Sequence, residues 1–100
     1  DPGNAAILVD KGSFLAHMGD HAEARTIALA LSARNDLDYN VMFDLAVLFE
    51  VLGDREKAFE WLEEALRAGQ PLKIVEVYPV LRNLRSTERY LEMKAALAEI

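Results

Sequence analysis

Two histidines and an aspartate within five residues are the side chains of this chain that best match a metal site. His17, Asp20 and His21 stand in the segment HMGDH. A zinc ion would need both imidazoles on one helix face and a further ligand nearby. Gly19 followed by Asp20 is instead typical of a helix end and the start of the next helix. We therefore predict no metal site and expect these side chains to be exposed or to cap a helix.

Paired carboxylates can serve as general acid and base, and Asp44 and Glu50 could share one surface. The chain has no cysteine, and it contains no glycine-rich phosphate loop, serine elbow or His-Glu zinc motif. Solvated helix surface accounts for these carboxylates without any reacting partner. We expect no enzyme activity and no cofactor.

Three arginines near the C-terminus, Arg82, Arg85 and Arg89, could hold an anion or an acidic peptide. The interpretation that we favour is that they pair with Glu88, Glu92 and helix ends. The sequence leaves both interpretations open.

The composition limits the classes of function. The 100 residues carry a net charge of −6, and we expect no nucleic-acid partner because phosphate binding needs a basic face. Residues 1–66 hold 13 acidic and 5 basic side chains, a net −8, whereas residues 67–100 hold 4 and 6, a net +2. No apolar run approaches the roughly 20 residues that cross a bilayer, and no signal peptide is visible. We expect no membrane insertion and favour the cytoplasm over the periplasm.

Apolar residues recur with helical spacing, and no segment shows the alternation of a strand, so the predicted fold class is all-α. The pattern predicts helices over about 5–18, 21–33, 39–52, 55–68, from 71 to before Pro79, and over 87–99, with a short turn around 80–84. Asp20, Asp38, Asp54 and Ser86 are placed to cap the helices that follow them.

One face of each helix is expected to be buried. The predicted inward residues are Leu8, Leu15 and Met18; Ala24, Ile27, Ala28 and Leu31; Met42, Leu45, Phe49 and Leu52; and Ala58, Phe59, Leu62, Ala65 and Leu66. Trp61 is expected to pack against the helix that begins near Pro71 rather than to form a ligand cage.

The first four helices carry one pattern twice, 34 residues apart. MGDHAEA at 18–24 matches LGDREKA at 52–58, and the same shift places Gly12 on Ala46 and Ala24 on Ala58. The second copy resembles the tetratricopeptide repeat family, with the motif Met42-x-x-Leu45-Ala46-x-x-Phe49 followed by Gly53-Asp54 and Ala58. The first copy departs from that motif at Lys11, where the family has leucine.

The resemblance covers residues 1 to about 70. It implies stacked helix pairs in a right-handed superhelix, with a first repeat over 1–34 and a second over 35–69 in one domain of 1–100. Residues 70–100 are similar to the irregular segments that end many bacterial repeat proteins, which implies a C-terminal capping helix. Asp1-Pro2 resembles the end of a preceding repeat, so we expect a piece of a longer protein.

In this family the first helix of each pair lines a concave groove, and the resemblance assigns ten residues to it. They are Ala6, Val9, Asp10, Ser13 and His17 from the first helix, and Asn40, Phe43, Asp44, Val47 and Glu50 from the third. Asn40 is similar to the groove asparagine that holds a ligand's backbone. The lysines and arginines of the family's carboxylate clamp are missing here, so we expect no binding of a chaperone's C-terminus.

The resemblance implies a protein-interaction scaffold that holds an extended or helical segment of a partner. Val9, Phe43 and Val47 would form an apolar centre with a polar, acidic rim. One alternative is a structural role at the end of a longer bacterial sensor or regulator, with possible self-association and with Phe43 covered by an upstream repeat or the C-terminal cap. A further alternative is a domain that senses a small ligand in the groove.

Overall fold

The computed structural model describes residues 3–98, and every regular element in that range is helical. The predicted all-α class is therefore confirmed. The four long helices are α1 (Ala5–His17), α2 (His21–Ser32), α3 (Tyr39–Val51) and α4 (Arg55–Ala68). The repeat end expected at Asp1-Pro2 and the helix end expected at Glu99 lie outside the described residues.

Each long helix begins at a side chain that caps it. Asn4, Asp20, Asp38 and Asp54 accept a hydrogen bond from the backbone N–H three residues on, at 3.1, 3.2, 2.9 and 3.2 Å. The bond satisfies one of the amides that the first helical turn leaves unpaired. The three predicted aspartate caps are confirmed, and Asn4 has the same role 34 residues before Asp38.

The two Gly-Asp junctions have the same geometry. Gly19 and Gly53 adopt φ values of +88° and +83°, a region that favours glycine because a β-carbon would be strained there. At both junctions the N–H of the following aspartate donates to the carbonyl five residues back, at 2.9 Å. The same turn therefore closes both helix pairs, α1–α2 and α3–α4, as the 34-residue period predicts.

The core lies where the helix pairs meet. Helix α1 packs against α2 and α3, and α3 packs against α4. Small residues permit this close approach, since Ala24, Ala46 and Ala58 are fully buried. A β-carbon added to Gly12 would come within 2.9 Å of a Leu48 methyl group, so α1 and α3 touch almost through the backbone of α1.

The chain after α4 forms shorter elements: α5 (Leu72–Val77), a 3-10 turn η1 (Pro79–Leu81), α6 (Arg82–Arg85) and α7 (Glu88–Ala98). Gly69 ends α4 with a φ of +123°. Helix α5 ends at Val77, two residues before Pro79, because the residue that precedes a proline disfavours the helical conformation. The turn predicted around 80–84 is helical instead.

The cap of α7 is Thr87, whereas the sequence pattern predicts Ser86. The Thr87 hydroxyl accepts a hydrogen bond from the Tyr90 N–H at 3.2 Å. The Ser86 hydroxyl donates to the Asn83 carbonyl at 2.8 Å and so belongs to the end of α6. Ser86 and Thr87 are adjacent in the short connection between α6 and α7, and both carry a hydroxyl that could cap a helix. The course of the backbone determines that Thr87 is the residue that caps α7.

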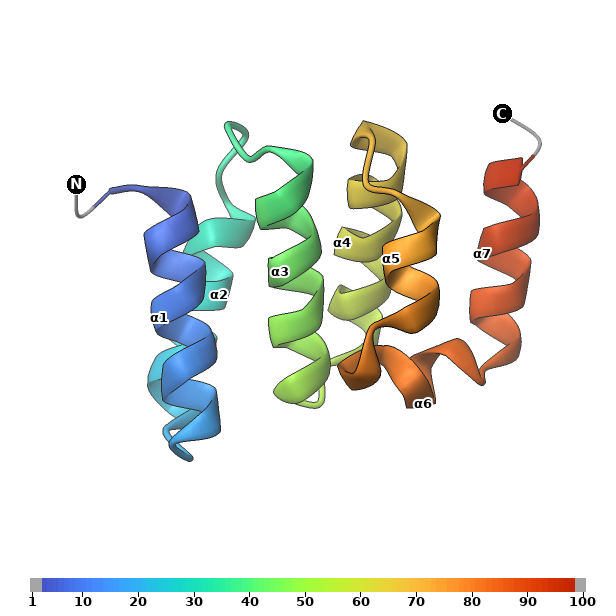
Figure 1. The fold of residues 1–100 in the computed structure, drawn as a ribbon. Helices are drawn as coiled ribbons and strands as arrows, with labels where there is room; N and C mark the ends of the chain where they lie inside the picture. The colour runs from blue at the N-terminus through green and yellow to red at the C-terminus, as the bar shows by residue number, and fades with distance from the viewer. Residues whose placement is uncertain (1–2, 99–100) are drawn as a thin grey trace.

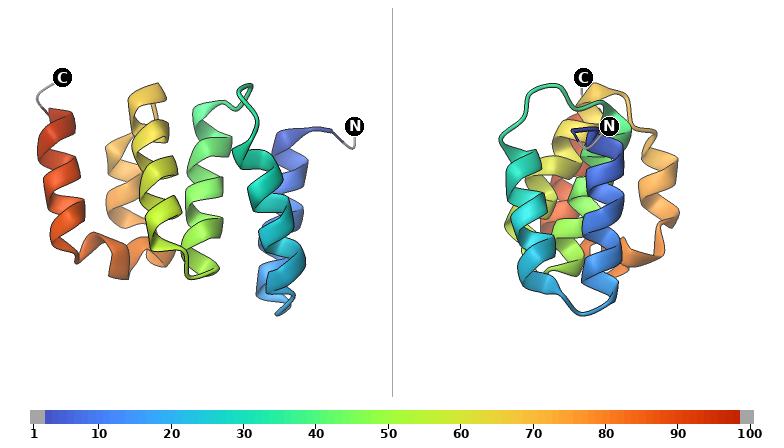
Figure 2. Two further views of the ribbon diagram at one scale, coloured as in Figure 1. Left: turned by 180° about the vertical axis from the view of Figure 1, so that it is seen from behind. Right: turned by 90° about the vertical axis from the view of Figure 1, so that its left-hand side faces the viewer.

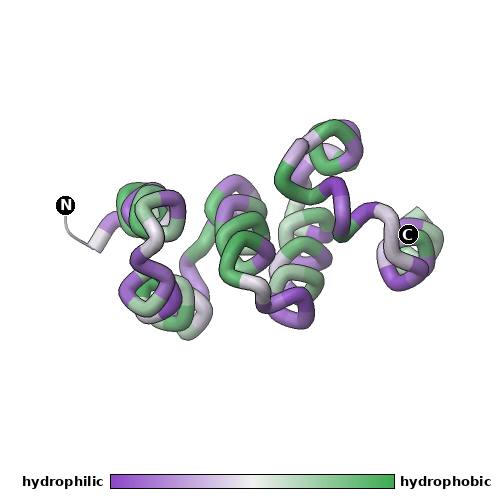
Figure 3. The backbone as a smooth tube through the Cα atoms, turned by 90° about the horizontal axis from the view of Figure 1, so that it is seen from below, coloured by the Kyte–Doolittle hydropathy of each residue, from purple (hydrophilic) through white to green (hydrophobic). Residues whose placement is uncertain are grey.

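The helices stand in a row from α1 to α7 (Figure 1). Seen along the row, α1 and α2 lie side by side, and α5 lies farther out on the α1 side (Figure 2). Seen from below, α3 is set back between α1 and α5, while α2 and α4 lie on the other side (Figure 3). Helices α1, α3 and α5 therefore share one face of the molecule.

The buried face of α1 differs from the prediction. Val9, Gly12 and Ala16 are its buried residues, and Met18, predicted inward, is 70% exposed. Leu8 and Leu15 are partly buried against the core. Met18 lies at the end of the row of helices, where no element of residues 3–98 covers it. Its helical spacing predicted burial, but it remains exposed because it has no neighbour there.

Candidate interaction surface

The ten residues predicted for a groove belong to α1 and α3, two helices that stand on the same side of the molecule (Figure 3). Ala6, Asp10, His17 and Asn40 are exposed; Ser13, Asp44, Val47 and Glu50 are half-buried; Val9 and Phe43 are buried. Four residues of α1 stand 34 positions before four of α3, so the surface is built twice from equivalent positions.

Val9 and Phe43 are not available as anchors for a partner. They are 1% and 4% exposed, and they occupy equivalent positions of the two helix pairs. Burial at both sites places this position of the pattern in the interior rather than on the open face. The predicted apolar centre is therefore wrong, and Val47 is the one member of it that is left partly exposed.

Phe43 is covered by the C-terminal segment. The Tyr78 ring meets it edge to face, with ring centroids 5.0 Å apart and planes at 88°, an arrangement that aromatic pairs favour. Arg85 fixes the backbone there, since its Nη1 donates to the carbonyls of Val75 at 2.9 Å and Tyr78 at 2.5 Å. Arg85 thus binds the end of α5, which agrees with the expectation that the arginines pair with helix ends.

What remains on the α1/α3 face is polar and acidic. Asp44 is half-buried, and burial raises the pKa of its carboxyl, with Asp10 and then Asp38 adding to the rise by like-charge repulsion. Among the described residues, none of the three carboxylates pairs with a lysine or arginine. The sequence pattern predicted Asp38 only as a helix cap, although it stands six residues before Asp44.

Glu50 and His17 already have partners within the chain. Arg55 donates two hydrogen bonds to the Glu50 carboxylate, at 2.9 and 2.7 Å. His17 Nδ1 lies 2.7 Å from the Ser13 carbonyl and donates to it. Glu50 is therefore neutralised by Arg55, and the acid–base pairing considered for Asp44 and Glu50 has no geometric support.

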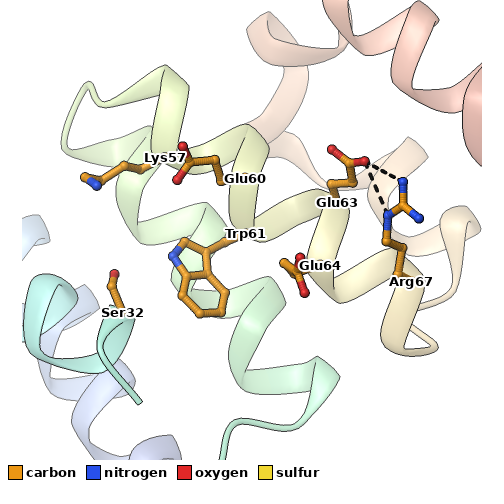
Figure 4. A pocket seen from close by; sticks show the side chains of 7 residues that line it. All are labelled: Ser32, Lys57, Glu60, Trp61, Glu63, Glu64 and Arg67. Atoms are coloured by element: carbon orange, nitrogen blue, oxygen red, sulfur yellow. Dashed lines mark hydrogen bonds and ion pairs between the residues drawn. The ribbon is translucent and has the colours of Figure 1, made fainter. Parts of the chain in front are cut away.

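A hollow of about 710 Å³ lies on the opposite side of the molecule, beside α4. Its lining residues are Ser32, Lys57, Glu60, Trp61, Glu63, Glu64 and Arg67. Figure 4 shows the Trp61 indole directed toward Ser32 of α2, with Glu63 and Arg67 paired farther along α4. Trp61 thus lies beside α2, and the predicted packing against α5 is wrong.

Polar contacts with α4 and with α5 hold α7 in place. Arg89 pairs with Glu56 of α4 at 2.6 Å and lies 4.5 Å above the Phe59 ring, so the predicted pairing with Glu88 or Glu92 is wrong for this arginine. On the α5 side, Glu76 accepts hydrogen bonds from Lys94 and from the Tyr90 hydroxyl. These bonds lower the pKa of Glu76, and burial together with Glu76 raises the pKa of Tyr90.

Within residues 3–98, no three acidic or histidine side chains are grouped so as to hold a metal ion. None of the helices in that range has both the length and the apolar character that crossing a membrane requires. Comparison of the chain with known protein families, with curated proteins and with solved structures finds no match.

Proposed function

We propose that this chain is a non-enzymatic protein-interaction module that binds a basic segment of a partner on its α1/α3 face. In this proposal α1–α2 and α3–α4 are two tetratricopeptide-like repeats of a right-handed superhelix, and α7 is its capping helix. The support is the 34-residue period together with the matching caps and Gly-Asp turns of both pairs.

The observation that carries the proposal is the carboxylate of Asp44, which no lysine or arginine of residues 3–98 pairs with. It is half-buried on α3 and repelled by Asp10 and Asp38. A lysine or arginine of a partner would relieve this repulsion and form charge-assisted hydrogen bonds. Val9 and Phe43 are buried and cannot serve as apolar anchors for a partner. We therefore expect recognition by charge and by polar groups such as Asn40. The affinity should fall as the salt concentration rises.

A titration with labelled peptides tests the proposal. A fluorescent peptide of alternating lysine and serine should bind the chain at low salt, and a glutamate–serine peptide of the same length should not. The double variant Asp10→Asn, Asp44→Asn should lose most of the affinity. The matched control is Glu60→Gln, Glu64→Gln, which removes the same charge from exposed residues of α4.

The outcomes separate recognition from bulk charge. Loss of affinity in the aspartate variant alone supports the α1/α3 face. Equal loss in both variants would mean attraction by net charge, and no binding of the basic peptide by the natural chain would reject the proposal.

The structural alternative has one specific observation in its favour, because Tyr78 covers Phe43 as a closing segment would. A chain with this role would bind neither peptide and would serve to terminate a helical array. Light scattering over a range of concentrations would reveal the self-association that this alternative allows.

A further inference from the structure

A small hollow lies between α7 and the junction of α4 with α5, at the C-terminal end of the row of helices (Figure 1). Its volume is about 240 Å³. The lining is mainly aliphatic with two polar side chains, and it consists of Leu66, Gln70, Leu72, Lys94, Leu97 and Ala98. We call this site the α7 hollow. It shares no residue with the α1/α3 face or with the hollow beside Trp61.

Gln70 brings a buried amide to the α7 hollow. It is 6% exposed, whereas the other lining residues are half-buried or exposed. Its Oε1 atom is buried, and no donor of residues 3–98 lies within hydrogen-bonding distance of that atom. Buried polar atoms are nearly always paired, because an unpaired one loses its bonds to water without compensation. A molecule bound in the hollow could supply the donor that the described chain does not.

The turn that ends α4 fixes Gln70 in this position. Gly69 has a φ of +123°, and its N–H donates to the Leu66 carbonyl at 3.3 Å. The Gln70 N–H donates to the Ala65 carbonyl at 2.9 Å. These two bonds form a Schellman motif, in which the residue after the glycine commonly makes an apolar contact with the last helical turns. The backbone therefore places a hydrogen-bonding group where an aliphatic side chain is common.

Polar bonds hold the α7 wall of the hollow. Lys94 and the Tyr90 hydroxyl both donate to the Glu76 carboxylate of α5. Helix α7 is thus bound to α5 one turn before Leu97, and the Lys94 ammonium is already neutralised within the chain. The α7 hollow therefore offers aliphatic surface and one buried acceptor, and its one charged lining residue is paired.

The size and chemistry of the lining define the ligand. An apolar cavity of about 150 Å³ in another protein binds benzene, so a hollow of about 240 Å³ can hold one such ring with a small substituent. The buried acceptor favours a substituent that donates a hydrogen bond, because a molecule without a donor leaves the Gln70 Oε1 atom unpaired. Since Lys94 is already paired, a neutral molecule suits the hollow better than an anion.

We propose that the α7 hollow binds a small neutral molecule of the phenol class, with a single apolar ring and one hydrogen-bond donor. Its hydroxyl donates to the Oε1 atom of Gln70, and its ring contacts the leucines of the lining. The hollow is a different surface from the α1/α3 face, so this inference does not depend on the proposed function.

Phenol and toluene test the proposal, because they are nearly equal in size and differ in the hydroxyl group. Each is titrated into the full chain while proton–nitrogen NMR spectra follow the backbone amides and the side-chain amide of Gln70. Phenol should shift the signals of the lining residues and bind at least about threefold more tightly than toluene. Toluene is the more apolar of the two, so burial of apolar surface alone would give the opposite order.

Three variants define the contact. Gln70→Met keeps the length of the side chain and removes the amide, so toluene should then bind more tightly than phenol. Ala98→Phe adds a ring to the lining and should weaken phenol binding by about tenfold or more, because it fills the hollow. The matched control is Ala96→Phe, at an exposed position of α7 outside the lining, and it should bind phenol as the natural chain does.

The inference is overturned if phenol shifts no signal of the lining residues up to its solubility limit. It is also overturned if toluene binds the natural chain as tightly as phenol, since Gln70 would then not select for a donor. Equal phenol affinity in Ala98→Phe and Ala96→Phe would place the ligand outside the hollow, whether or not Gln70→Met folds. Binding of the basic peptide to the α1/α3 face is measured separately, so the two proposals fail independently.

Discussion

The pairs α1–α2 and α3–α4 follow one local pattern in two different surroundings. Both begin their helices at a capping side chain and turn at a glycine with φ near +85°. The second pair, however, lies between the first pair and the C-terminal segment. Within residues 3–98, the first pair packs against the second pair on one side only. Equivalent residues therefore share backbone conformation and differ in burial.

Lys11 and Leu45 illustrate this difference. They occupy the same position, yet Lys11 is exposed and Leu45 is fully buried. A repeat period thus fixes where helices start and stop, while neighbouring elements decide which residues carry the packing energy.

Replacing these two residues by alanine gives the largest expected contrast. Leu45→Ala should lower the free energy of unfolding by about 2–5 kcal/mol, because it leaves a cavity in the core. Lys11→Ala should change it by no more than about 0.5 kcal/mol, as surface substitutions do. Urea denaturation measures both, and equal effects would show that the two environments do not differ as described.

Overpacking tests what the two pairs have in common. Ala24 and Ala58 are both fully buried at the crossing of their helices. Ala24→Leu and Ala58→Leu should each cost about 1–3 kcal/mol of stability. Ala30→Leu, at an exposed site of α2, is the control and should be nearly neutral; thermal melts in which all three match would place the helix crossings elsewhere.

The polar link between the pairs should have an intermediate effect. Arg25→Ala removes the bond to the Leu52 carbonyl and the contact with Asp54, and it should cost about 0.5–1.5 kcal/mol. The control Arg67→Ala breaks an exposed pair with Glu63 within α4, expected to contribute only about 0.3–0.5 kcal/mol. If Arg67→Ala destabilised the chain more, the link from α2 to the second pair would be unimportant.

The equivalent aspartates give the smallest contrast and a pH dependence. Folding raises the pKa of Asp44, so stability is lost as the pH rises from the ordinary carboxyl pKa through the raised value. Asp44→Asn removes that loss and should stabilise the chain by less than about 1 kcal/mol at pH 7. The gain should vanish at pH below about 4, where the natural carboxyl is protonated in both states.

Asp10→Asn is the partner measurement at the equivalent position. It removes a like charge from the surroundings of Asp44 and should give a smaller gain of the same sign. A gain that grew as the pH fell would contradict the environment described for Asp44.

Much of the local structure was readable from the sequence. The predicted ranges of the four long helices agree with the observed ones to within one residue, because capping aspartates and left-handed glycines mark helix ends through short-range contacts. The C-terminal segment was less readable, since the 3-10 turn after Pro79 and the cap at Thr87 depend on how the chain passes from α5 to α7.

The candidate surface was only partly predictable. Asp10 and Asp44 follow from helical spacing and the family resemblance, and both lie on the α1/α3 face. Phe43 was misplaced because its cover, Tyr78, is 35 residues away in the sequence. Met18 was predicted to be buried but is exposed, because no element of residues 3–98 packs against its side of α1.

Residue types and their spacing were enough to specify the elements: the all-α class, the 34-residue period, the caps and the turns. These features depend on interactions within a few residues, so they can be predicted without knowing the fold. Packing between distant segments determined which of two equivalent positions is covered and which is open. It thereby buried Phe43, left Phe14 in solvent, and brought the carboxylates of Asp10, Asp38 and Asp44 together on one face.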